Sequence, residues 1–194
     1  MYRYFKRFLD IVLSAMGLLV LSPILLVIAI AIKLDSKGPV LFKQKRVAKG
    51  KEHFQILKFR TMYADVPKDV PTHLLADPES KITKIGRFLR KSSLDELPQI
   101  WNILVGEMSI IGPRPALWNQ FDLIAERDKY GANDVRPGLT GLAQVMGRDE
   151  LPIEVKAKYD GEYAQNVTFA NDVKIFFKTI TSVLGAKGVK EGKQ

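Results

Sequence analysis

Two adjacent carboxylates, Asp95 and Glu96, are the residues of this chain best suited to chemistry at a phosphate. A carboxylate can attack phosphorus as a nucleophile, as it does in enzymes that form an aspartyl phosphate. Two neighbouring carboxylates can also hold Mg²⁺, which binds one or two of them together with substrate phosphates. The structural alternative is that both residues only stabilise the dipole of a helix that begins here. Asp95, Gln99 and Asn102 recur at i, i+4 and i+7, so they share one face of that helix, the face away from the apolar stripe.

Basic side chains near this pair are candidate ligands for a phosphate. Arg90 stands shortly before Asp95 in the sequence. Arg114 lies between Pro113 and Pro115, and the two proline rings restrict the backbone on both sides of it. A guanidinium held in this way suits bidentate binding of phosphate or carboxylate, although an exposed arginine on a turn remains the alternative.

Two other segments carry groups that could bind an anion. The loop 136–148 contains three glycines, whose backbone amides can approach an anion closely, but it matches neither a P-loop nor a dinucleotide-binding fingerprint. Lys58 and Arg60 stand at the end of a predicted strand, where the alternative is a basic strand facing solvent. The chain has no cysteine and two histidines, which excludes thiolate metal sites and argues against a histidine-rich zinc site.

The elements that position these residues are predicted to be short. Residues 39–60 are expected to form a β-hairpin whose turn contains Lys49 and Gly50. Residues 63–81 hold three prolines and mixed charges, which predicts a loop. Residues 83–91 have the apolar spacing of a short helix.

Two further helices are predicted from capping signals and apolar periodicity. Ser93 to Glu96 matches a capping box that opens the helix carrying the carboxylates. Its buried face is predicted to carry Leu97, Ile100, Trp101 and Leu104. A C-terminal helix capped by Asn171 has an apolar face that we expect to join the core rather than to lie on a membrane surface. The residues of that face are Val173, Phe176, Phe177, Ile180 and Leu184.

An uncharged apolar segment occupies residues 11–32 and is about 33 Å long if it is helical, enough to span a bilayer. A cleavable signal peptide is disfavoured because the run is too long and a basic stretch follows it. A single span is disfavoured because both flanks are basic, and positive charge prefers the cytoplasmic side. The third interpretation is a re-entrant helix-break-helix with its bend at Ser22-Pro23. Pro23 leaves the carbonyl of Leu19 without its amide partner, and the Ser22 hydroxyl could satisfy that carbonyl. The sequence physics leaves the span and the re-entrant interpretation open.

The distribution of charge points to a membrane partner rather than to nucleic acid. Residues 1–62 carry twelve Lys and Arg against three acids, an excess of nine, whereas residues 63–194 carry eighteen of each sign. The whole excess therefore flanks the apolar segment, where it would attract anionic lipid.

In their order along the chain, these segments resemble one family, the bacterial sugar transferases, and within it the small monotopic polyprenyl-phosphate phosphoglycosyl transferases. The resemblance extends from about Tyr4 to Leu184. Each motif is weak by itself, and their joint order is specific. The motifs are Lys6-Arg7 with Asp10, Ser22-Pro23, GPVLFKQKRV from Gly38, KFRTM from Lys58, SLDELPQ from Ser93, GPRP from Gly112, and RPGLTG from Arg136 with Ala143-Gln144-Val145.

The resemblance implies a two-step reaction. Asp95 would attack the β-phosphate of a UDP-sugar, release UMP and hold the phosphosugar covalently. The phosphate of a polyprenyl carrier, undecaprenyl phosphate, would then take the phosphosugar from the enzyme. This would be the first membrane step in the synthesis of a surface glycan or glycoconjugate.

The resemblance also assigns roles to particular residues. Asp95 and Glu96 are the catalytic pair and the ligands of Mg²⁺, the family's cofactor, with Glu96 the principal metal ligand. The predicted substrate-binding residues are Arg90, Arg114, Arg148, Lys58, Arg60, Arg136 and Gln144. With the family taken into account, the apolar segment is expected to be re-entrant, with Ser22 and Pro23 as the membrane break.

We therefore predict an α+β, mainly helical, monotopic membrane protein with an N-terminal re-entrant helix-break-helix and a small β-hairpin. Residues 1–36 would be the membrane anchor, residues 37–185 a cytoplasmic catalytic domain, and residues 186–194 a basic, frayed tail. The expected location is the cytoplasmic face of the bacterial inner membrane, with anionic lipid as a further partner and no nucleic acid. The alternative function is a membrane-anchored scaffold without catalytic activity.

Overall fold

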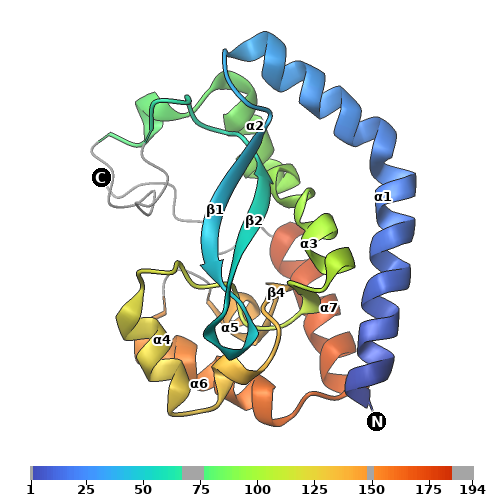
Figure 1. Cartoon of the computed structure of the whole chain (residues 1–194), viewed down its shortest axis with the longest axis vertical. Helices are drawn as coiled ribbons and strands as arrows, with labels where there is room; N and C mark the ends of the chain where they lie inside the picture. The colour runs from blue at the N-terminus through green and yellow to red at the C-terminus, as the bar shows by residue number, and fades with distance from the viewer. Residues whose placement is uncertain (1, 67–76, 148–150, 185–194) are drawn as a thin grey trace.

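One long helix, α1 (Tyr2–Asp35), runs along the side of the computed structural model and curves over its top (Figure 1). The structure describes residues 2–66, 77–147 and 151–184. Helix α1 has 34 residues, which corresponds to about 51 Å of helix. Within the described residues it is the one helix long and apolar enough to cross a membrane. Most of its apolar side chains are exposed, among them Phe8, Leu19 and Val27.

The other elements are shorter than α1 and form a body beside it (Figure 1). They confirm a mainly helical fold with a small hairpin. The predicted basic tail at residues 186–194 lies outside the described residues. In chain order the elements are β1 (Leu41–Val47), η1 (Lys49–Lys51), β2 (His53–Phe59), η3 (Glu79–Lys81), α2 (Lys84–Ser92), η4 (Leu94–Glu96), α3 (Gln99–Val105), β3 (Ser109–Ile111), α4 (Phe121–Asp128), η5 (Ala132–Asp134), β4 (Gly138–Thr140), α5 (Leu142–Met146), α6 (Ile153–Gln165) and α7 (Phe169–Leu184).

The predicted break at Ser22-Pro23 is a position inside an unbroken helix. Helix α1 continues through Pro23. The Ser22 hydroxyl donates to the carbonyl of Leu19 over 2.8 Å, as expected for the group that the proline leaves without an amide partner. The two-helix description is therefore corrected to one curved helix, in which a side-chain hydrogen bond replaces the missing backbone bond.

The N-terminal end of α1 is fastened to the body by three polar residues. Lys6 donates to Asp172 of α7 over 2.7 Å. Arg7 donates over 2.6 and 2.8 Å to the carbonyls of Ile103 and Leu104 at the C-terminal end of α3, where helix carbonyls need partners from outside the helix. Asp10 is buried and accepts from the amide of Ile110 over 3.0 Å. These contacts give a structural role to the Lys6-Arg7 and Asp10 motif.

The C-terminal end of α1 is fastened to the same body. Ile28 and Ile32 are buried in an apolar cluster with Phe59 of β2 and Leu89 of α2. Asp35 accepts from the amide of Ile85 at the start of α2 over 3.2 Å. Both ends of the apolar helix therefore belong to one packed unit.

The predicted hairpin is confirmed, and a second small sheet accompanies it. Strands β1 and β2 are antiparallel, and η1 forms the turn between them. Strands β3 and β4 form a two-stranded parallel sheet that the sequence patterns did not predict. Near it, a Cβ on Gly138 or Gly141 would lie 2.1 or 2.0 Å from the backbone of Gly112. The expected close backbone approach in loop 136–148 is therefore made against the turn that carries Arg114.

The predicted capping box is wrong, and the predicted buried face of α3 is wrong at Trp101, while Leu97, Ile100 and Leu104 are half-buried. Ser93 adopts a left-handed conformation (φ 56°) and makes no capping hydrogen bond, so Asp95 and Glu96 lie in η4, before α3 begins. On α3, Trp101 is 51% exposed, whereas Asn102 is 1% exposed.

A polar side chain can be buried here because it completes the hairpin. The amide of Leu57 donates to Asn102 Oδ1, and Asn102 Nδ2 donates to the carbonyl of Gln55, so Asn102 pairs with the free edge of β2. Asn102 Nδ2 also donates to Glu107 over 2.6 Å.

The apolar face of α7 is also oriented differently from the prediction. Phe176, Phe177 and Ile180 are exposed, and the side chain of Leu184 lies outside what the structure describes. Ile175 is buried instead, in a cluster with Ile111 and Tyr163. The expectation that the Phe176–Ile180 face joins the core is therefore wrong.

Because Asn102 holds the edge of β2, Asn102→Ala is expected to lower the free energy of unfolding by about 3 kcal/mol. The substitution leaves the part-buried Leu57 amide and Gln55 carbonyl without their partner. Denaturant unfolding of the detergent-solubilised protein measures the change. Asn166→Ala, at an exposed asparagine, is the control and should stay within about 0.5 kcal/mol of wild type. Equal effects of the two substitutions would contradict this role.

Candidate active site

Asp95 and Glu96 are positioned by a sharp turn between α2 and α3. Helix α2 begins at Thr83, whose side chain accepts from the amide of Gly86, and ends at the left-handed residue Ser93. Leu94 and Leu97, on either side of the carboxylates, pack against the cluster that contains Phe59 and Leu89. The turn is therefore held by apolar contacts on both sides, and its carboxylates lie next to the end of β2.

Glu96 is the centre of an ion-pair network. Its Oε1 accepts from Lys58 Nζ over 2.7 Å and from Arg114 Nη2 over 3.2 Å. Burial alone would raise the pKa of the Glu96 carboxyl, but the charges of Lys58 and Arg114 and their hydrogen bonds outweigh it and hold that pKa well below its usual range. Glu96 is therefore ionised at neutral pH. It orients two cations from segments far apart in the sequence, Lys58 on β2 and Arg114 on the turn after β3.

Asp95 differs from Glu96 in its hydrogen bonding and in the direction of its pKa shift. It accepts no hydrogen bond from the residues that the structure describes. Burial raises the pKa of the Asp95 carboxyl and the negative charge of Glu96 adds to the shift, while Lys58 and Arg90 oppose it. Because no side chain among the described residues donates to its oxygens, Asp95 is the carboxylate available to act as a nucleophile.

Arg46 belongs to the site and was missed by the sequence analysis. Its guanidinium donates to Gln44 Oε1 and to the carbonyl of Pro115, next to Arg114. Burial, with the like charge of Arg114, lowers the pKa of Arg46 to about 9. Strand alternation could have identified Arg46. In the hairpin register Phe42 lies opposite Lys58, and Phe42 and Arg46 are four residues apart on the same strand. Side chains an even number of residues apart lie on the same face of a strand, so Arg46 and Lys58 share one face.

The site carries a net positive charge that suits an anionic ligand. Four cations, Lys58, Arg46, Arg90 and Arg114, interact electrostatically with the two carboxylates, an excess of two positive charges. Arg90 also donates through Nε to the Thr61 hydroxyl over 2.9 Å, which fixes it between α2 and the end of β2. A ligand with two phosphate charges would neutralise this excess.

Of the seven predicted substrate-binding residues, three join the carboxylates and three lie elsewhere. Lys58, Arg90 and Arg114 surround the pair, as described above. Arg60 is buried and donates to the carbonyls of Pro39 and Ser36 and to the Ser36 hydroxyl, so it secures the segment after α1.

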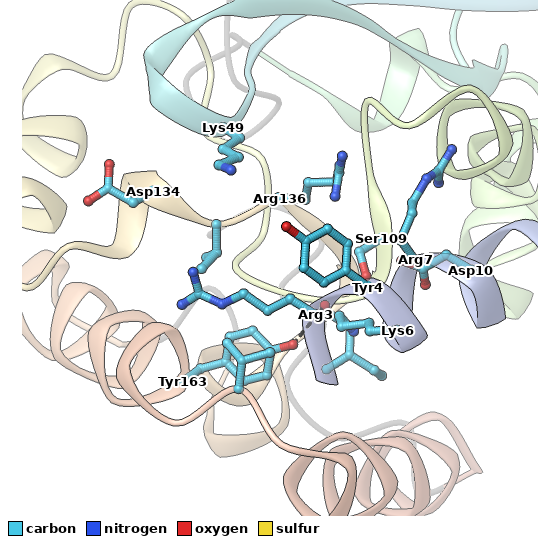
Figure 2. Close-up of a pocket in the computed structure, with 13 residues that line it drawn as sticks. Arg3, Tyr4, Lys6, Arg7, Asp10, Lys49, Ser109, Asp134, Arg136 and Tyr163 are labelled. Atoms are coloured by element: carbon cyan, nitrogen blue, oxygen red, sulfur yellow. Dashed lines mark hydrogen bonds between the residues drawn. The ribbon is translucent and has the colours of Figure 1, made fainter. Parts of the chain in front are cut away.

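The remaining predicted ligands do not contribute a described contact to the pair. Gln144 donates locally to the carbonyl of Leu139. Arg136 donates through Nε to the carbonyl of Gly106 and lines a separate pocket (Figure 2). Arg148 lies outside the described residues.

The oxygen ligands present fit Mg²⁺ better than a metal that needs an all-protein cage. Within the described ranges, no group of three or more His, Cys, Asp or Glu side chains is placed to hold a metal. Asp95 and the second oxygen of Glu96 supply one or two carboxylates with unused lone pairs, and Mg²⁺ completes its coordination with phosphates and water. The residues therefore fit the predicted cofactor.

The chain matches a known family over almost its whole length. Residues 1–186 match the family described as bacterial sugar transferase. The chain is 42% identical over 188 residues to a UDP-glucose:undecaprenyl-phosphate glucose-1-phosphate transferase of Caulobacter vibrioides, covering 92% of this chain and 69% of that protein. It is 33% identical to the exopolysaccharide production protein ExoY of Sinorhizobium fredii, covering 94% of this chain and 87% of that protein.

Other relatives are much longer than this chain. It is 38% identical to a UDP-N-acetylgalactosamine-undecaprenyl-phosphate N-acetylgalactosaminephosphotransferase of Aeromonas hydrophila. That alignment covers 97% of this chain and 46% of the relative. The chain therefore spans less than half the length of several of the curated relatives it matches.

Glu96→Gln is expected to destabilise the protein at neutral pH by about 1–3 kcal/mol, because it leaves Lys58 and Arg114 partly buried without their counter-ion. A carboxylate whose pKa is lowered by folding contributes stability above its unfolded pKa of about 4.3 and loses it as the pH falls toward the folded pKa. The difference between wild type and variant should therefore be constant from pH 7 down to about 5 and shrink at more acidic pH.

Denaturant unfolding at pH 7 and at pH 3 measures this difference. Glu162→Gln, at an exposed glutamate on α6, is the matched control and should show no such pH-dependent gap. A gap between wild type and Glu96→Gln that stays the same at both pH values would contradict the ion-pair network.

Proposed function

This chain belongs to the bacterial sugar transferase family, and from that membership we propose that it transfers a phosphosugar from a UDP-sugar to undecaprenyl phosphate and releases UMP. The reaction is that of a phosphoglycosyl transferase, the activity that the names of its relatives describe. It would be the first membrane step in making a surface glycan, and an exopolysaccharide protein is among the relatives.

The observation that carries this proposal is the difference between two adjacent carboxylates. Glu96 is engaged by Lys58 and Arg114, whereas Asp95 accepts no hydrogen bond from the described residues and lies within the same positive field. A nucleophile needs free lone pairs, and a diphosphate substrate needs cations near the atom that is attacked. The site supplies both.

The proposed chemistry has two displacements at the same phosphorus. In the first, an Asp95 oxygen bonds to the β-phosphorus of the UDP-sugar, the bond from that phosphorus to the bridging oxygen breaks, and UMP leaves with the electron pair. In the second, an oxygen of undecaprenyl phosphate bonds to the phosphorus and the Asp95 carboxylate leaves. The sugar phosphate has then moved to the lipid and Asp95 is regenerated.

The neighbouring residues would stabilise charge during both displacements. Arg114 and Arg90 would bind the phosphate oxygens, and Lys58 would neutralise charge between Glu96 and the substrate. Arg46, held by Gln44, would fix the position of the segment that carries Arg114. Mg²⁺, held by Glu96 and Asp95, would supply Lewis-acid stabilisation of the diphosphate when bound.

The attachment of α1 supports a monotopic arrangement on the cytoplasmic face of the inner membrane. Lys6 and Arg7 at one end of the helix, and Asp35 at the other, are all hydrogen-bonded to the same body. A helix that crossed the bilayer would carry these two ends to opposite sides and break one set of contacts. We propose that α1 enters and leaves one leaflet, with Ser22-Pro23 at its deepest part and both basic flanks near anionic lipid.

Asp95→Asn is expected to lower UMP release by at least about a thousandfold, because the amide cannot form the covalent intermediate. Purified wild type is mixed with a panel of UDP-sugars, Mg²⁺ and undecaprenyl phosphate, and UMP is measured. Intact-protein mass spectrometry without undecaprenyl phosphate should detect a phosphosugar adduct on Asp95. Asp122→Asn, at an exposed carboxylate on α4, is the control and should behave as wild type.

Undiminished UMP release by Asp95→Asn would exclude the covalent mechanism. Turnover that depends on Asp95 without any adduct would favour a single-step transferase. A protein that binds membranes but releases no UMP with any donor would favour a membrane-anchored scaffold.

The topology can be tested by labelling, because the chain has no cysteine. Tyr4→Cys and Lys37→Cys place single thiols at exposed positions at the two ends of α1, and Lys158→Cys marks the catalytic body. In inverted inner-membrane vesicles, all three should react with a membrane-impermeant maleimide, because re-entry keeps both flanks cytoplasmic. In right-side-out vesicles, all three should be protected. If Tyr4→Cys reacted in right-side-out vesicles and not in inverted vesicles, α1 would span the bilayer.

A further inference from the structure

A second cationic pocket lies beside the first turns of α1 (Figure 2). Its volume is about 400 Å³. The N-terminal turns of α1 form one wall, and Lys49 of the hairpin turn and Arg136 form another. Ser109 and Tyr163 also line it. The pocket therefore joins the membrane helix to the catalytic body.

This pocket is distinct from the site around Asp95. None of its lining residues is among the side chains that surround the two carboxylates. Lys49 lies in the turn at one end of the hairpin, whereas Lys58, the partner of Glu96, lies near the other end. The strand from His53 to Lys58 alone spans about 17 Å. A ligand at Lys49 is therefore far from the attacking carboxylate.

Two of the cations that line the pocket have no partner in the described part of the chain. Lys6 and Arg7 bind Asp172 and the end of α3, and Arg136 uses Nε on the carbonyl of Gly106. Arg3 and Lys49, by contrast, make no hydrogen bond or ion pair with any part of the chain that the structure describes. Five cations line the pocket against two carboxylates, Asp10 and Asp134, which leaves an excess of three positive charges. Like charges in excess repel each other, so an anion that joins them is favourable.

A buried hydroxyl in the pocket points to the same kind of ligand. Ser109 is 1% exposed and lines the pocket, and its Oγ has no hydrogen-bond partner among the described residues. A buried hydroxyl left unpaired is unfavourable. An oxygen-rich anion that receives bonds from Arg3 and Lys49 could also accept from this hydroxyl.

We propose that this pocket binds the phosphate head group of an anionic phospholipid. The proposal rests on the membrane placement of α1 proposed above. Tyr4 lines the pocket and is exposed, and the apolar residues that follow it on α1, such as Phe8, are exposed as well. The pocket therefore lies where the basic N-terminal turns meet the apolar surface of the helix. Lipid head groups are found at that boundary, with the acyl chains along the apolar side chains. A bound lipid would thus hold the N-terminal end of α1 at the membrane surface.

Native mass spectrometry of the full chain in neutral detergent tests the site. Wild type is titrated with phosphatidylglycerol and with phosphatidylcholine, and bound lipid is counted. Removing two cations, in Arg3→Gln/Lys49→Gln, should weaken phosphatidylglycerol binding roughly tenfold or more. Ser109→Ala should also weaken it. The control, Arg87→Gln/Lys158→Gln, removes the same charge at exposed positions outside the pocket and should bind as wild type.

If the control and the pocket variants lose phosphatidylglycerol binding equally, the lipid is attracted by the general positive charge of the protein. That result would overturn the proposed site. Displacement of phosphatidylglycerol by inorganic phosphate, with the same dependence on Arg3 and Lys49, would overturn the lipid assignment in favour of a soluble phosphate compound. Lipid binding is read without turnover. Absence of UMP release from the same preparations would therefore count against the transfer reaction and not against this pocket.

Discussion

The ion-pair network of Glu96 is the interaction on which the arrangement of the candidate active site depends. A single carboxylate oxygen joins Lys58 on β2 to Arg114 on the turn after β3, and Glu96 itself belongs to η4. Three segments far apart in the sequence are thereby fixed around Asp95. Bringing such charges together in a partly buried place costs desolvation energy that offsets much of their attraction. The network is therefore better explained by the charge it orients than by the stability it adds.

The rest of the fold supplies the surroundings that this network requires. Asn102 holds β2 against α3, which places Lys58 opposite η4. Gly112 and Gly138 let two backbones meet with no room for a Cβ, which holds the Arg114 turn against β4. Arg60 secures the segment between α1 and the hairpin. Each contact is remote from Asp95, yet each limits where one of its cations can lie.

Local patterns were predictable from the sequence, and contacts between segments were not. The hairpin, the helix at residues 84–92 and the bond from Ser22 to Leu19 follow from turn residues, apolar spacing and the chemistry of proline. Residues Lys58, Arg90 and Arg114 were found because their motifs stand near the carboxylates or restrict the backbone. Arg46 was missed, and Arg60 lies away from the carboxylate pair, because the contacts of both depend on which carbonyls the folded chain brings to them.

The differences between the predicted and observed faces of α3 and α7 have one physical explanation. Periodicity shows which side chains share a face of a helix. The prediction that an apolar face is buried in the protein assumes that the protein core is the only apolar environment it can contact. In this chain Trp101 of α3 and Phe177 of α7 are exposed, while Asn102 and Asp172 point inward to polar partners. If α1 enters a leaflet, the bilayer offers a second apolar surface, and the usual assignment of faces can be reversed. Asn102 and Asp172 are buried against polar partners on helices whose apolar faces remain exposed, as expected when those faces meet lipid instead of protein.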